Sequence, residues 1–139
     1  MKIKFVVVGK TVEKYLIDVC GEYERRIKKY VPFEIVVVKD FKNAALFSGA
    51  NVFLLDEHGE EYTSKKFSEF LEKKMATSSK DIIFAIGGPF GFDEKTYERA
   101  DAKISLSKMT FPHQMVRLIF LEQLYRAFTI MHNEPYHHE

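Results

Sequence analysis

The chain has 139 residues and a formal net charge of +1, with 46% hydrophobic and 29% charged residues. This length and balance indicate a single folded domain, residues 1–139, that can bury a hydrophobic core, and they exclude a disordered chain. So small a net charge argues against a protein that coats nucleic acid, and a single cysteine, Cys20, excludes an intramolecular disulfide.

The apolar runs of the chain are short. None approaches the roughly 20 residues that a membrane-spanning helix needs. The opening stretch, residues 1–9, has a basic start, but its apolar part is shorter than a signal-peptide core and no small-residue cleavage site follows it. We therefore expect a cytoplasmic protein without a membrane partner.

Strand and helix patterns alternate from the N-terminus onwards. IKFVVVG (3–9) is almost continuously apolar and predicts a strand buried on both faces. Residues 11–30 have helical spacing, Pro32 closes that helix, and FEIVVV (33–38) predicts a second strand. The residues expected to face inward from the helix are Leu16, Val19, Cys20, Tyr23, Ile27 and Tyr30.

The middle of the chain continues this alternation. NVFLLD (51–56) predicts a third strand that ends in the turn EHGEE (57–61). Thr63 or Ser64 is expected to cap a helix through KKFSEFLEKKMA (65–76). The inward residues of that helix are expected to be Phe67, Phe70, Leu71 and Met75.

The C-terminal half predicts two more strands and two more helices. DIIFAIGG (81–88) predicts a strand that enters a glycine-rich loop, and DEKTYERA (93–100) predicts a short helix. KISLS (103–107) predicts a fifth strand. Residues 113–131 predict the longest helix, which is apolar around most of its circumference.

Strands separated by helices predict an α/β fold with a mainly parallel sheet and helices on both faces. Ligands of such sheets bind beyond the carboxyl ends of the strands, so Asp56, the loop 87–91 and the segment after Ser107 are expected on one edge. The last helix has more apolar surface than one sheet face can cover. We therefore expect its outer face to form the interface of a two-fold homodimer.

Positive charge gathers near the N-terminus. ERRIKKY (24–30) holds four basic residues. Such a run is usually the solvated face of a helix, although a few well-placed cations can also contact phosphates.

Two loops have the composition of ligand-binding segments. IGGPFGF (86–92) lies between a strand and a helix, but its spacing is neither the dinucleotide fingerprint nor a phosphate-binding loop, so a plain turn is an equal alternative. In SLSKMTFPHQ (105–114), successive backbone amides could hold a polar cofactor. Thr110 as a cap and Pro112 at a helix start are the structural alternative.

The last eight residues, HNEPYHHE (132–139), contain three of the five histidines. A metal site, a loose tail and part of an active pocket are the alternatives. No CxxC or HExxH motif is present, and the adjacent His137 and His138 cannot easily turn both rings toward one ion, so we expect no metal. These patterns leave the reaction open.

Three segments, taken together and in order, resemble one family. IGGPFGF (86–92), ISLSKMTFPHQMVRLIFLEQLYRAFTIM (104–131) and NEPYHHE (133–139) are similar to the RlmH-type ribosomal RNA large-subunit methyltransferases of the SPOUT class. The resemblance extends to MKIKFVVVGK (1–10) and EYERR (22–26), so it covers essentially the whole chain. One departure is that KDFKNAALFSGA is shorter than the corresponding segment usual in the family.

This resemblance implies transfer of a methyl group from S-adenosylmethionine to N(3) of a pseudouridine in large-subunit (23S) rRNA within the ribosome. It also implies a homodimer and a C-terminal trefoil knot. A SPOUT enzyme acting on another RNA such as tRNA, and a non-catalytic RNA-binding module, are the alternatives. The implied cofactor pocket consists of Leu55, Gly87, Leu106, Ser107, Lys108, Met109, Thr110 and Phe111.

None of these pocket residues is acidic, so the sulfonium of the cofactor is expected to have no close carboxylate. That would suit a donor whose positive charge disappears in the transition state.

The resemblance also gives the C-terminal tail a role. In a dimer, the tail of one subunit can reach the cofactor pocket of the other. Tyr136 and His137 would then help to hold the target base, with Arg126 and His113 near the phosphates or the base. An idle, frayed tail is the alternative.

Overall fold

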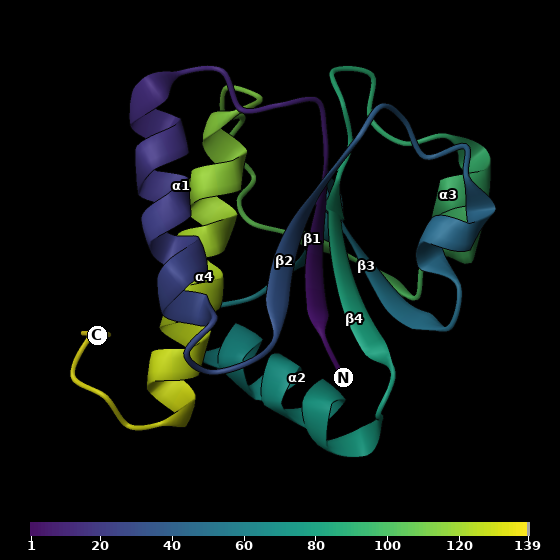
Figure 1. The fold of residues 1–139 in the computed structure, drawn as a ribbon. Coiled ribbons are helices and arrows are strands. Elements are labelled where there is room, and N and C mark those ends of the chain that lie inside the picture. Colours follow the sequence, from purple (N-terminus) through teal and green to yellow (C-terminus); the bar gives the residue numbers. More distant parts are fainter. Residues whose placement is uncertain (139) are drawn as a thin grey trace.

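Five parallel strands form the centre of the protein in the computed structural model, which describes residues 1–138 (Figure 1). The sheet has the order β2-β1-β4-β3-β5, and each neighbouring pair is parallel. Its strands are β1 (Ile3–Val8), β2 (Phe33–Val38), β3 (Ala50–Glu61), β4 (Asp81–Ile86) and β5 (Ala102–Ser105). The predicted α/β fold with a parallel sheet is confirmed, whereas the trefoil knot stays a prediction.

Helices cover both faces of this sheet, as predicted. The three long helices, α1 (Lys14–Ile27), α2 (Ser64–Thr77) and α4 (Met115–Met131), lie on one face (Figure 1). The short helix α3 (Glu94–Arg99) and a single 3₁₀ turn, η1 (Ala44–Phe47), lie on the other. None of the helices within residues 1–138 is long and apolar enough to cross a membrane.

The larger core lies between the sheet and the three long helices. Phe5 of β1 and Phe84 of β4 both pack on Phe120 of α4, with ring centroids 4.7 and 4.9 Å apart. All three side chains are at most 1% exposed. Fully burying one such ring stabilises the fold by about 1.5–3 kcal/mol, so the first strand and the last helix are held in one shared core.

The helix predicted over residues 11–30 is α1, which is shorter at both ends. Val19, predicted to face inward, is 39% exposed, and that prediction is wrong. The other five predicted inward residues are buried or pack against the core: Leu16, Cys20, Tyr23, Ile27 and Tyr30.

Helix α4 is better covered than its sequence predicted. No residue of α4 is exposed in the single chain, because α1 and α2 both pack along it. Exposed apolar side chains are found instead on α1 and the segment before it, with Val12 71% and Tyr15 57% exposed. An apolar surface that a second subunit could cover therefore includes α1 as well as α4.

Strand β3 is longer than the sequence predicted. The strand continues through the predicted turn at 57–61 with a register shift, so that Leu55 and Glu60 both pair with Ile104 of β5. A Cβ atom on Gly59 would lie only 2.6 Å from the backbone nitrogen of Ile104 and 2.6 Å from the carbonyl carbon of Lys103. Glycine fits this irregular stretch because the backbone of β5 approaches it too closely for a side chain.

We expect Gly59→Ala to lower the free energy of unfolding by about 1–3 kcal/mol, since the two backbones must move apart to admit the methyl group. Gly21→Ala, inside α1, is the matched control. Its added carbon would lie 3.6 Å from the Arg25 side chain, an ordinary contact. Removing an interior helix glycine should stabilise the protein by about 0.5–1 kcal/mol. Urea unfolding measures the stability change of both variants. A Gly59→Ala protein as stable as the wild type would contradict the close approach of β3 and β5.

Candidate functional site

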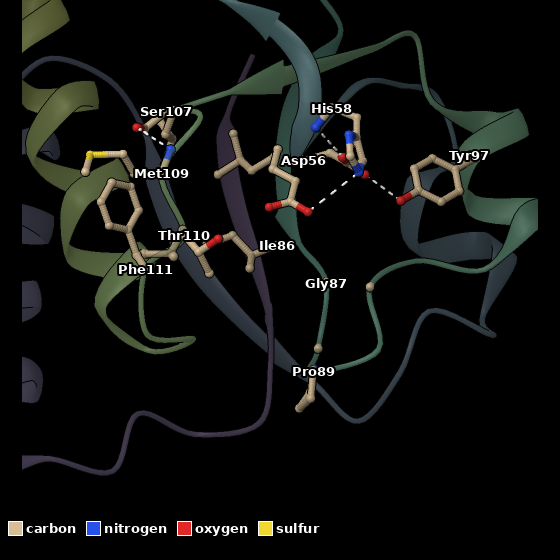
Figure 2. Close-up of a pocket in the computed structure, with 16 residues that line it drawn as sticks. Asp56, His58, Ile86, Gly87, Pro89, Tyr97, Ser107, Met109, Thr110 and Phe111 are labelled. Carbon is tan, nitrogen blue, oxygen red and sulfur yellow. Dashed lines mark hydrogen bonds and ion pairs between the residues drawn. The ribbon is translucent and has the colours of Figure 1, made fainter.

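A pocket of about 430 Å³ opens beyond the ends of the central strands (Figure 2). Residues of three separate segments line it, from 55–58, 86–91 and 106–111. Tyr97 of α3 and Val116 in the first turn of α4 complete the wall. The parallel sheet brings these segments together, because strand ends that are far apart in sequence meet at one edge.

Seven of the eight residues expected in a cofactor pocket line this one cavity. Lys108 is the exception: its side chain is 86% exposed and forms an ion pair with Glu61 at 3.7 Å. The seven that line the pocket are Leu55, Gly87, Leu106, Ser107, Met109, Thr110 and Phe111.

The glycine loop is a tight turn that also borders the pocket. The Gly91 N–H donates to the Gly88 carbonyl oxygen at 2.9 Å, and Gly91 has a φ of +74°, a conformation that favours glycine. A Cβ on Gly87 would lie 2.8 Å from the carbonyl carbon of Gly91. The loop is therefore both a tight turn and part of the pocket wall, so the two interpretations do not exclude each other.

The loop before α4 is fixed by its own serines. Ser105 donates to the Ser107 carbonyl oxygen at 3.0 Å, and the Ser107 hydroxyl accepts from the Met109 N–H at 3.0 Å. Thr110 does not cap the helix, because α4 begins at Met115 and Gln114 occupies the N-cap position. The structural alternative for Thr110 is therefore wrong.

Acidic side chains also line the pocket. Asp56 and Glu57 belong to its wall, so the cavity as a whole does contain carboxylates, whereas the expectation that none lies close to the sulfonium stays a prediction. Asp56 accepts a hydrogen bond of 2.5 Å from the Tyr97 hydroxyl and one of 2.8 Å from the backbone N–H of His58. The sequence had placed Asp56 on the ligand-binding edge, at the end of an apolar strand, but not among the expected cofactor residues.

Those two hydrogen bonds stabilise the charged form of Asp56. Burial by itself would raise the pKa of its carboxyl, but the bonds from Tyr97 and His58 outweigh burial and hold that pKa below its usual value. The same contact, together with burial, raises the pKa of Tyr97 to about 12. At neutral pH the pocket thus contains an ionised carboxylate beside a protonated tyrosine.

The C-terminal tail lies at the far end of α4 from the pocket (Figure 1). Tyr136 donates to Glu122 at 2.8 Å, and its hydroxyl lies 3.2 Å from that of Tyr23. Arg126 pairs with Glu122 at 2.7 Å and lies 2.9 Å from Nδ1 of His137. We call these five residues the tail cluster. It unites three of the four side chains expected to act on the substrate.

No member of the tail cluster lines the pocket of its own chain. Val116 borders the pocket, whereas Arg126 lies ten residues further along the same helix, a rise of about 15 Å. The fourth expected residue, His113, follows the pocket loop but does not line the cavity either. Burial, with a smaller contribution from the charge of Arg117, lowers the pKa of His113 and favours its neutral form.

Tyr136 and His137 of the tail are packed rather than frayed. The Arg126 guanidinium lies 4.9 Å from the centre of the Tyr136 ring, and Tyr136 packs edge-on against Tyr125 at 4.8 Å. Burial, and then the hydrogen bonds with Tyr23 and Glu122, raise the pKa of Tyr136. Glu122 holds this arrangement and was missed from the sequence, although its i, i+4 spacing from Arg126 on a helix predicts their ion pair.

The basic run near the N-terminus pairs mostly within its own helix. Arg25 and Arg26 both form ion pairs with Glu22, and Lys28 forms one with Glu24. This favours the interpretation of a solvated helix face for that run.

Comparison with known sequences places this chain in a protein family. A family model described as "Predicted SPOUT methyltransferase" matches residues 1–137. The chain belongs to the SPOUT methyltransferase family. A protein of Parabacteroides distasonis named Ribosomal RNA large subunit methyltransferase H is 50% identical over the full length of both chains. A relative of the same name from Christiangramia forsetii is 49% identical over 99% of each chain.

Solved structures share the fold of this chain at low sequence identity. A protein of Haemophilus influenzae described as "a probable methylase family protein" superposes with a TM-score of 0.59 and 12% identity, over 94% of this chain and 66% of that one. The alignment with the Parabacteroides relative spans 157 residues against the 139 of this chain, so the relative has residues that this SPOUT protein lacks.

Proposed function

We propose that this protein is a homodimeric, single-domain cytoplasmic enzyme that transfers the methyl group of S-adenosylmethionine to N(3) of a pseudouridine in large-subunit rRNA. The observation that carries this proposal is the single cavity lined by seven of the eight residues implied by the family resemblance. Full-length relatives named Ribosomal RNA large subunit methyltransferase H support the choice of RNA.

The cavity suits a nucleoside-sized donor. Its volume of about 430 Å³ lies in the range of small-molecule sites. Leu55, Leu106 and Phe111 supply apolar walls, while the turn at Gly87 brings backbone polar groups to the rim without a side chain in the way. Such a lining can hold an adenine ring by its faces and read its edge through main-chain groups.

Bound S-adenosylmethionine would supply an electrophilic methyl group on a positively charged sulfur. The protein must then place N(3) of the target base in line with that methyl group. The methyl–sulfur bond would break as the new C–N bond forms, and the N(3) proton would pass to solvent. The imide N–H is acidic, so positioning and exclusion of water carry much of the acceleration. Tyr136 and Arg126 can provide this positioning through stacking and hydrogen bonds.

Those positioning residues have to come from a second subunit. Within one chain, the tail cluster and the pocket lie at opposite ends of α4. A two-fold dimer would bring the tail of each subunit to the pocket of the other. The exposed Val12, Tyr15 and Val19 supply apolar surface that such a dimer would bury.

A methyl-transfer assay tests the proposal. The protein is incubated with methyl-labelled S-adenosylmethionine and, separately, intact ribosomes, free large-subunit rRNA and tRNA, and the labelled nucleoside is identified by mass mapping. We expect label as N(3)-methylpseudouridine in large-subunit rRNA only. Ribosomes with uridine at the target position are the control. Label in tRNA alone would support the alternative substrate, and cofactor binding without transfer would support a non-catalytic module.

A further inference from the structure

The Asp56 carboxylate in the pocket wall is held by two hydrogen bonds. Figure 2 shows Asp56, His58 and Tyr97 on one side of the cavity, with Ser107, Met109, Thr110 and Phe111 on the other. The Asp56 carboxylate uses one lone pair of each oxygen, for Tyr97 and for the His58 N–H. An ionised carboxylate has about four acceptor positions, so about two remain for a ligand.

Tyr97 is itself held in place from the other face of the sheet. Its ring packs edge-on against Phe92, with centroids 5.7 Å apart. Its helix α3 is capped by Asp93, which accepts from the Thr96 N–H at 2.8 Å. The hydroxyl of Tyr97 therefore fixes the orientation of the Asp56 carboxylate before any ligand arrives.

We propose that Asp56, oriented by Tyr97, binds the ribose hydroxyls of the adenosine moiety of the methyl donor. The inference rests on the proposed function and extends it to a residue outside the expected cofactor set. Two hydroxyls on adjacent carbons present two donors to one carboxylate, and hydrogen bonds to an ionised group are about twice as strong as neutral ones. Tyr97 acts through Asp56 and is a positioning residue.

The position of Asp56 favours the ribose over the ammonium group of the donor. Asp56 directly follows Leu55, an apolar wall residue proposed to lie against the adenine. Both residues line the same cavity at the end of β3, so a sugar attached to that adenine lies nearer to Asp56 than more distant parts of the donor. The ammonium group lies beyond the 5′ sulfur, several bonds further from the base.

Calorimetric titration with two ligands separates these two roles. S-adenosylhomocysteine has both the ribose and the amino acid, whereas 5′-deoxy-5′-methylthioadenosine has the ribose and no amino acid. We expect Asp56→Asn to weaken both ligands by a similar factor, about 10- to 100-fold, which corresponds to hydrogen bonds to a charged group. Unchanged affinity for methylthioadenosine alongside weaker S-adenosylhomocysteine would overturn the ribose assignment in favour of the ammonium group. Unchanged affinity for both would remove Asp56 from the site.

The wild-type titration distinguishes this inference from the function on which it rests. If the wild-type protein binds neither ligand, the proposed methyltransferase function fails. If it binds both and Asp56→Asn does too, only the ribose assignment fails. Glu60→Gln is the matched charge control, because Glu60 is an exposed carboxylate on the same strand that does not line the pocket. Thermal unfolding of each variant shows whether it is folded.

A double-mutant cycle tests the positioning role of Tyr97. Tyr97→Phe keeps the ring and removes the hydroxyl, and should weaken both ligands by about 3- to 10-fold, the size of one lost hydrogen bond. In the Asp56→Asn background the same change should have little further effect, because its target carboxylate is gone. A merely structural role for Tyr97 predicts that the two losses multiply, and that result would overturn the proposed coupling.

Discussion

Ending the chain at Pro135 is expected to reduce the rate of methyl transfer at least about 100-fold, because the target base loses the side chains that position it. Affinity for S-adenosylmethionine should stay nearly unchanged, since none of the tail residues 132–138 lines the pocket of its own chain. Single-turnover methyl transfer and calorimetric titration measure the two effects separately.

Truncation should also cost some stability, which the sequence did not predict. Tyr136 hydrogen-bonds to Glu122 and packs on Tyr125 with centroids 4.8 Å apart. Losing these contacts should lower the free energy of unfolding by about 1–2 kcal/mol. His138→Ala is the matched control, because His138 is an exposed residue of the same tail and should retain activity.

Mixed dimers show whether the site is shared. One subunit lacks the tail after Pro135, and the other carries Gly87→Val in its pocket. Their heterodimer would unite one intact pocket with one intact tail and should regain about one working site per dimer. Sedimentation must first show that both parents are dimers. Full activity of the truncated homodimer, or an inactive heterodimer, would contradict the sharing of Tyr136 and His137 across the interface.

Gly87→Val is expected to abolish binding of S-adenosylmethionine. The first added carbon would already lie 2.8 Å from the carbonyl carbon of Gly91 and 2.9 Å from its oxygen. The backbone of the loop must move, in addition to any loss of space for the adenosine. Even Gly87→Ala should therefore weaken binding strongly.

Gly88→Ala provides the matched comparison for this loop. Its added carbon would lie 3.5 Å from Cγ1 of Val8, an ordinary contact with a side chain. We expect a much smaller loss of affinity than for Gly87→Ala, with both proteins folded by circular dichroism. Equal affinities for the two variants would mean that the close approach of Gly87 to Gly91 has no part in shaping the pocket.

The sequence predicted the elements well because each depends mainly on its own apolar pattern. The full length of β3 was not predicted, and there is a physical reason for this. A glycine within a polar run such as EHGEE is typical of a turn, and nothing in the local pattern shows that Ile104 of another strand lies against Gly59. A close approach between two strands is a property of the pair and is invisible in either one.

The candidate site also has features that the sequence predicted and features that it did not. Its glycine loop and the loop before α4 were predicted from local composition together with the family resemblance. The pairing of Asp56 with Tyr97 was not, because the two residues are far apart in the sequence and belong to different elements. Glu122 lay within reach of a sequence argument, since its spacing from Arg126 is that of a helical ion pair.

The contact between Phe5 and Phe120 has a consequence for how the protein is made. A growing chain emerges with β1 first, yet the helix that covers this face of β1 is synthesised last. Neighbouring β4 is also distant in sequence, since Ile3 pairs with Ile82. The nascent chain can therefore pair β1 with β2 early, but its apolar face stays open to chaperones and to aggregation until nearly the whole chain has left the ribosome.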